Sequence, residues 1–194
     1  MIVGHFGLAA GVKARETSVP LWSLMMATVW LDIAFVPLLL SGIEAIEPVP
    51  GTAGAFGQII IHADWTHSLV GAVFLSAVLG VIAGLAWGRR AGWVLGGVSF
   101  SHWLLDLIVH RADMPVLPGN WGGIPRLGLG LWQYPFAEII VEAAIIGGGA
   151  FLYYQAARSA VTSSGASSAR PAMVAGLIVA GGVAILAYQA STLF

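Results

Sequence analysis

The feature that most constrains this chain is a series of five long apolar runs. The first covers residues 21–40 and is broken only by Ser23, Thr28, Asp32 and Pro37. A helix of about twenty residues crosses the roughly 30 Å hydrocarbon core of a bilayer. Four more runs cover residues 66–87, 91–110, 127–155 and 172–193. The sequence therefore predicts an all-α integral membrane protein, with a single domain over residues 1–194, a bundle of about five transmembrane helices and a short re-entrant or interfacial segment at the amino terminus.

The composition supports this assignment and excludes several classes of function. Hydrophobic residues are 58% of the 194 residues and charged residues 9%, against roughly 25% charged in soluble domains. The formal net charge is −1, so the chain lacks the basic surface that binds nucleic acid. It has no cysteine, which excludes disulfides, thiolate nucleophiles, iron–sulfur clusters and zinc sites with cysteine ligands. Any metal ion must therefore be bound by His, Asp or Glu.

The distribution of Lys and Arg predicts the orientation, because cationic residues are retained on the cytoplasmic side. With five spans, six cationic residues fall on one side: Lys13, Arg15, Arg89, Arg90, Arg158 and Arg170. Arg111 and Arg126 fall on the other side. We therefore expect a cytoplasmic amino terminus and an external carboxyl terminus, in the inner membrane of a bacterium.

Ionisable residues inside the apolar runs are the main indication of function. Each costs roughly 2.5–3.5 kcal/mol to insert, so such residues line a cavity, pair or bind a ligand. His102, Asp106 and His110 recur every four residues, within an arc of about 80° on one helix face. At 1.5 Å per residue from the external ends, the ionisable residues of four runs lie about 6 to 16 Å deep: Asp32, His67, His102, Asp106 and Glu138. This common depth predicts a cavity that opens to the external face.

Imidazole and carboxylate are the usual ligands of zinc, manganese and iron where thiolates are absent. We expect a divalent metal ion, zinc in the first place. Its expected ligands are His62, His67, His102 and Asp106, with Asp32 as a fifth candidate. His62 can join His67 only if it precedes the helix, with Asp64 or Thr66 as the N-cap. Glu138 or Asp64 is expected as the general base, and Glu142 lies deeper on the face of Glu138. A metal-free, proton-conducting cluster and structural hydrogen bonding are the alternatives.

Two stretches, HADWTHSLV (residues 62–70) and GVSFSHWLLDL (residues 97–107), resemble motifs of a known family. It is the family of membrane-bound, predicted metal-dependent hydrolases of the LexA-regulated type, with a His-Arg-x-x-Thr-His-Ser motif and a later Ser-His-x-x-x-Asp motif. The matching positions are His62, Thr66, His67 and Ser68, then Ser101, His102 and Asp106. The resemblance also assigns His5, in the opening Gly-His, and Asp32, at the first residue of an Asp-x-Asp-His element.

The chain departs from the family pattern at three positions. Ala63 replaces the Arg of the first motif, and Ala34 and Phe35 replace the second Asp and the His of the acidic element. The departures remove up to two ligands, which is compatible with fewer metal ions or with an inactive relative.

The resemblance implies a membrane-embedded, metal-dependent hydrolase that acts at the external face on an ester or phosphoester, either a small molecule or a membrane lipid. Two other functions fit the residues. One is a non-catalytic subunit, assembled with other membrane subunits, that retains part of an ancestral metal site. The other is a small proton or ion pathway. The Pro- and Gly-rich segment 111–126 is expected to cover the cavity as a lid, with Trp121 as its apolar contact.

Overall fold

The computed structural model describes residues 1–163 and 167–193 and confirms an all-α membrane protein. Within the described residues, four helices are long and apolar enough to cross a bilayer. They are α4 (Leu69–Trp87), α5 (Arg89–Val109), α6 (Pro135–Ser163) and α7 (Ala169–Ser191). The helices α2 (Leu21–Thr28) and α3 (Trp30–Leu40) meet at an angle of 46° and together make a fifth, broken span.

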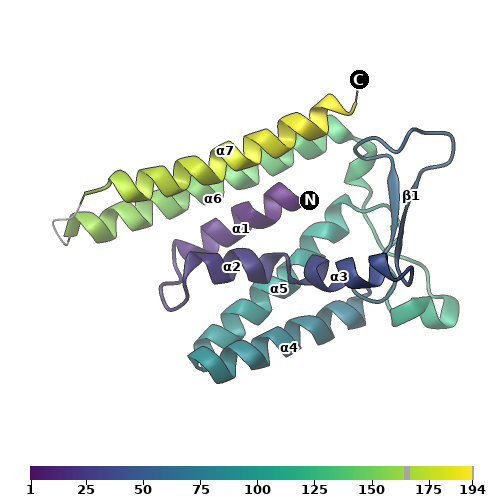
Figure 1. The fold of residues 1–194 in the computed structure, drawn as a ribbon, viewed down its shortest axis with the longest axis horizontal. Helices are drawn as coiled ribbons and strands as arrows, with labels where there is room; N and C mark the ends of the chain where they lie inside the picture. Colours follow the sequence, from purple (N-terminus) through teal and green to yellow (C-terminus); the bar gives the residue numbers. More distant parts are fainter. Residues whose placement is uncertain (164–166, 194) are drawn as a thin grey trace.

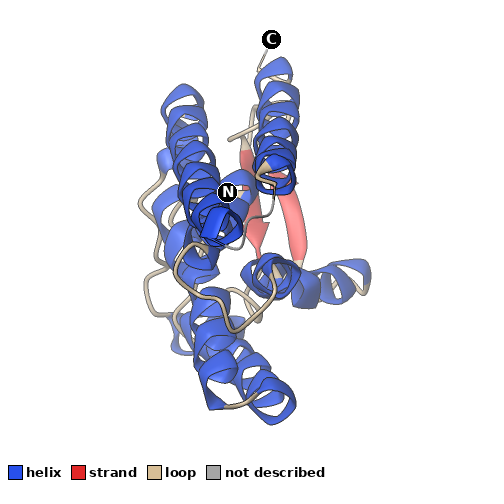
Figure 2. Cartoon of the chain, turned by 90° about the vertical axis from the view of Figure 1, so that its left-hand side faces the viewer, coloured by secondary structure: helices blue, strands red, loops and turns tan. Residues whose placement is uncertain are grey.

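The helices form two hairpins with shorter helices between them. The α6–α7 hairpin and the α4–α5 hairpin lie on opposite sides of the molecule, with α1 (Ile2–Lys13) and α2 between them (Figure 1). A two-stranded antiparallel sheet stands at one end, formed by β1 (Ala45–Pro48) and β2 (Ile59–His62) (Figure 2). The short helices η1 (Pro118–Gly123) and η2 (Leu131–Gln133) belong to the connection between α5 and α6 at the same end.

Two helices begin later than the apolar runs suggest. The helix α6 begins at Pro135 rather than at residue 127, because the preceding chain pairs Leu127 with Met114 and then turns at Gly130, where φ is +77°. Proline is favoured at the first position of a helix. The N-cap of α4 is Ser68, whose hydroxyl accepts a hydrogen bond from the Gly71 amide at 3.0 Å, rather than Asp64 or Thr66. Residues 64–67 and 127–134 therefore lie outside α4 and α6.

The break between α2 and α3 frees the carbonyl group of Thr28 from the helical hydrogen-bond pattern. In a continuous helix the carbonyl of Thr28 would accept from the amide of Asp32. At the break, Val29 has φ −113° and ψ 18°, and the carbonyl of Thr28 is instead 2.7 Å from Nδ1 of His102. The bend thus supplies a hydrogen-bond acceptor to the polar cluster.

The first helix reaches the interior of the bundle, as required if His5 is to join the site. Gly7 of α1 lies against the backbone of α6 at Ile145, and Gly149 of α6 lies against the backbone of Gly7. Glu142 of α6 accepts a hydrogen bond from the amide of Gly4 at 2.9 Å, which satisfies one of the free amides at the start of α1. The amino group of Met1 is 3.7 Å from Asp106, inside the bundle.

The contact between α1 and α6 leads to a stability prediction. A side chain at Gly149 would collide with the carbonyl oxygen of Gly7, so we expect Gly149→Leu to displace α1 and lower the midpoint of thermal unfolding in detergent. Overpacking costs about 1–3 kcal/mol. Gly147→Leu is the matched control, because a Cβ at Gly147 meets no atom within 4 Å. Equal midpoints for the two variants would contradict this packing.

The α1–α2 and α4–α5 connections and the carboxyl end of α6 lie on the same side of the molecule. That side is opposite the two-stranded sheet (Figure 1). Glu16 links the two connections through an ion pair with Arg90 at 3.0 Å. Hydrogen bonding from Ser18, assisted by Arg90, lowers the pKa of Glu16 to about 2. The six cationic residues that the sequence assigns to one side lie in the α1–α2 connection and in the ends of α1, α5, α6 and α7.

The orientation in the membrane remains a prediction that cysteine labelling can test. We expect the side with the α1–α2 and α4–α5 connections to be cytoplasmic. In this cysteine-free chain, Ser159→Cys lies on that side and Thr52→Cys lies in the loop between the strands. An impermeant thiol reagent added to intact cells should label Thr52→Cys and leave Ser159→Cys unlabelled. The reverse pattern would invert the topology.

Candidate metal centre

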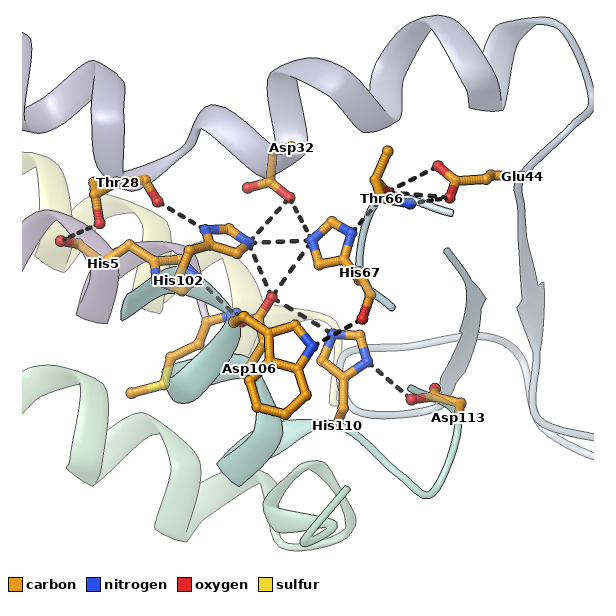
Figure 3. A network of polar contacts seen from close by, with 12 residues as sticks. His5, Thr28, Asp32, Glu44, Thr66, His67, His102, Asp106, His110 and Asp113 are labelled. Atoms are coloured by element: carbon orange, nitrogen blue, oxygen red, sulfur yellow. Dashed lines mark hydrogen bonds and ion pairs between the residues drawn. The ribbon is translucent and has the colours of Figure 1, made fainter. Parts of the chain in front are cut away.

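Four of the expected ligands meet in one buried cluster. Figure 3 shows Asp32 of α3, His67 just before α4, and His102 and Asp106 of α5 turned toward a common point. The Nε2 atoms of His67 and His102 are 3.2 Å apart, and each is 3.6 Å from Oδ1 of Asp32. Oδ2 of Asp106 is 3.0 Å from Nε2 of His102 and 3.7 Å from Nε2 of His67. Asp32, His67 and His102 form one group that could hold a metal ion, and His102 and Asp106 form another with His5.

The distances between these atoms are those of ligands around one ion. Bonds of about 2.0–2.1 Å place neighbouring donor atoms about 2.9 Å apart around a six-coordinate ion and about 3.3 Å apart around a tetrahedral one. The separation between the two Nε2 atoms, and those from each of them to the carboxylate oxygens of Asp32 and Asp106, run from 3.0 to 3.7 Å. Each carboxylate therefore lies at the spacing of a shared ligand set from both imidazoles.

The hydrogen bond of His102 to Thr28 determines which ring nitrogen carries the hydrogen. Nδ1 of His102 is 2.7 Å from the carbonyl oxygen of Thr28, which can only accept, so Nδ1 carries the hydrogen. The lone pair of the neutral ring is then on Nε2, toward His67 and Asp106. The hydroxyl of Thr28 donates in turn to the carbonyl of His5 at 3.2 Å.

His67 is oriented in the same way by a longer chain of contacts. Nδ1 of His67 is 2.9 Å from the hydroxyl oxygen of Thr66, and that hydroxyl donates to the carboxylate of Glu44 at 3.0–3.1 Å. The hydroxyl has one hydrogen, so its oxygen accepts from Nδ1 and leaves the lone pair of His67 on Nε2. Glu44 is also held by the amides of Trp65 and Thr66, both at 2.8 Å. A hydrogen-bonded outer partner on a histidine is typical of metal ligands.

His5 lies behind Asp106, on the side away from His67. Its ring stacks on that of His102, with centroids 3.9 Å apart, and its Nε2 is 3.0 Å from Oδ1 of Asp106. The carboxylate can only accept, so His5 donates and holds Oδ1 while Oδ2 faces the cluster. His5 is therefore placed as a residue that positions Asp106.

The remaining expected site residues lie elsewhere. His62 is in β2, is 39% exposed, and has its Nε2 3.5 Å from Glu47, because its strand pairs with β1 rather than leading into the cluster. Asp64 is bound through both carboxylate oxygens by Arg126, and these hydrogen bonds raise the pKa of the guanidinium group. Glu138 is fully buried on α6, one turn from Glu142, and does not line the cavity beside the cluster.

The cavity beside the cluster has a volume of about 100 Å³. Phe35, Ile61 and Trp132 line it together with polar side chains that include Asp32, His67 and Asp106. Trp121, the expected lid residue, is 81% exposed and is not part of the lining. The segment 111–126 contributes Asp113 instead, which contacts His110.

Sequence reasoning did not find Glu44, Thr28 or Asp113. Nothing in the local pattern marks them, since Glu44 is 22 residues from Thr66 and Thr28 contributes only a backbone carbonyl to His102. Comparison with family models, with curated proteins and with solved structures finds no match to the chain.

Proposed function

We propose that the protein is a membrane-embedded, metal-dependent hydrolase of esters or phosphoesters. The observation that carries the metal centre is that Nε2 of His67 and Nε2 of His102 face each other at 3.2 Å, and that a carboxylate oxygen of Asp32 and one of Asp106 each lie 3.0–3.7 Å from both nitrogens. Such atoms repel one another unless a cation lies between them. A single proton bonds to two of them at most, whereas a divalent ion contacts all four and balances both carboxylates.

The donor set supports a first-row divalent ion, zinc, manganese or iron. Asp32, His67, His102 and Asp106 would hold the ion, with Glu44, Thr28 and His5 fixing the orientation of three of these ligands. The ion would polarise the oxygen of a scissile bond and lower the pKa of water. Hydrolysis as the reaction class comes from the resemblance of the two His-containing motifs to membrane-bound metal-dependent hydrolases.

The volume of the cavity fits a small reacting group. A volume of about 100 Å³ corresponds to roughly three water molecules, which is enough for an ester or phosphoryl group and too little for a whole lipid. The side chain of Asp32 is 40% exposed, against 5% for those of His67 and Asp106, so the cluster opens on the side of α3. Phe35, Ile61 and Trp132 exclude water from the other sides.

The test separates the metal centre from the reaction. Metal analysis of the full chain purified in detergent should find one divalent ion per chain. The protein should also hydrolyse a phosphodiester, an aryl ester or phospholipid in vesicles, losing activity with a chelator and regaining it with the ion. An ion without hydrolysis of any of these substrates would overturn the reaction alone, and the absence of an ion would overturn both.

A further inference from the structure

A third imidazole faces the same cavity from the end of α5. The helix ends at Val109, and His110 adopts an extended conformation with φ −58° and ψ 146°. The amide of His110 still donates to the carbonyl of Asp106 at 2.8 Å, and its own carbonyl accepts from Gly130 at 2.7 Å. The ring is therefore held one helical turn beyond Asp106, beside the cluster.

The ring orientation of His110 is fixed by buried partners. Nδ1 of His110 is 2.9 Å from Oδ1 of Asp113, whose Oδ2 accepts from the amide of Ile61 at 3.2 Å. Both His110 and Asp113 are buried, and Trp132 packs against the ring with centroids 4.3 Å apart. Because Nδ1 donates to Asp113, the lone pair of the neutral imidazole is on Nε2.

The lone pair on Nε2 of His110 is directed toward Oδ2 of Asp106, the oxygen that also lies near His67 and His102. Nε2 of His110 is 3.8 Å from Oδ2 of Asp106, beside 3.0 Å for His102 and 3.7 Å for His67 (Figure 3). The rings of His67 and His110 lie nearly parallel, with centroids 6.4 Å apart. All three histidines thus repeat one construction, with Nδ1 anchored outward and Nε2 directed inward.

The structure favours one ion rather than two. Two triads of donor atoms could hold a metal, His5 with His102 and Asp106, and Asp32 with His67 and His102. His102 belongs to both but has one free nitrogen, because Nδ1 is bonded to Thr28. An imidazole nitrogen has one lone pair, so the two triads cannot be filled together. His5 moreover donates through Nε2 to Asp106 and has no lone pair there.

We propose that His110 is a third imidazole ligand of the single ion, held in place by Asp113. The inference rests on the proposed metal centre and completes a set of three imidazole nitrogens and two carboxylate oxygens: His67, His102, His110, Asp32 and Asp106. Five donors leave one position of a six-coordinate ion for water or substrate. Asp113 is a positioning residue, because it acts on the ion only through the ring of His110.

The test uses Mn²⁺ as the probe and counts coordinated nitrogens. Pulsed electron paramagnetic resonance of the full chain loaded with Mn²⁺ should show three imidazole nitrogens, and His110→Ala should show two. The Mn²⁺ affinity should fall about 100-fold in His110→Ala and about 10-fold in Asp113→Asn. His62→Ala is the matched control and should keep both the affinity and the nitrogen count.

The outcomes distinguish this inference from the metal centre itself. Two imidazoles in the unmodified protein, or an unchanged affinity in His110→Ala, would overturn the assignment of His110 and leave the centre intact. The nitrogen count of the unmodified protein decides the question even if His110→Ala fails to fold. Absence of Mn²⁺ and Zn²⁺ binding by the unmodified protein would overturn the centre and with it the role of His110.

Discussion

Loss of nearly all bound metal is the expected result of replacing His102 with alanine. His102 is fully buried, and its Nε2 lies within 3.0–3.6 Å of donor atoms of His67, Asp32 and Asp106. Removing it takes away the imidazole that lies nearest to the other ligand atoms, and we expect the metal affinity to fall at least 100-fold, the upper end of what loss of an outer partner costs. His67→Ala should have the same effect. Metal content of the purified variants, measured by mass spectrometry, is the readout.

Two controls make the result specific to the cluster. His62→Ala removes a histidine of the same sequence motif that lies outside the cluster, and it should keep full metal content. The circular dichroism and elution volume of each variant in detergent should match those of the unmodified protein. Full metal in His102→Ala, or loss of metal in His62→Ala with a normal fold, would contradict the ligand assignment.

The second large effect is expected at Glu44, which does not touch the ion. Its carboxylate accepts from the hydroxyl of Thr66, which orients His67, and from the amides of Trp65 and Thr66. Glu44→Ala leaves these buried donors without an acceptor, and outer partners of this kind contribute 10–100-fold to metal affinity. We expect a loss in this range, measured by competition with a chelating dye.

Glu44→Gln provides the matched comparison. The amide oxygen can accept from Thr66, but the charge is lost, so the affinity should lie between those of the unmodified protein and Glu44→Ala. Glu47→Ala on β1 should have no effect, since Glu47 faces the exposed His62. An affinity of Glu44→Ala equal to that of Glu47→Ala would show that the contact chain from Glu44 to His67 does not hold the ligand.

Local patterns in the sequence were sufficient for the fold class and for part of the site. The apolar runs gave the helices, because burial of an uncharged stretch of about twenty residues in a bilayer requires no knowledge of its neighbours. The four-residue spacing of His102 and Asp106 placed both on one face of α5, since helical periodicity is a local property. Equal depth also put Asp32, His67 and Glu138 in one layer; the structure brings the first two beside His102 and Asp106, and Glu138 does not line the cavity beside them.

The membership of the site depended on contacts between segments far apart in the chain. His62 and Asp64 belong to the same short stretch as His67, yet strand pairing turns one toward Glu47 and an ion pair commits the other to Arg126. The bend at Val29 frees a carbonyl for His102, and the turn after α5 brings Asp113 to His110. Hydrogen-bond partners are chosen by packing over distances of up to 138 residues in sequence, whereas periodicity and hydropathy report only on neighbours. The sequence by itself therefore determined the membrane bundle and the helix face that carries His102 and Asp106, and the tertiary structure decided which side chains meet in the cluster.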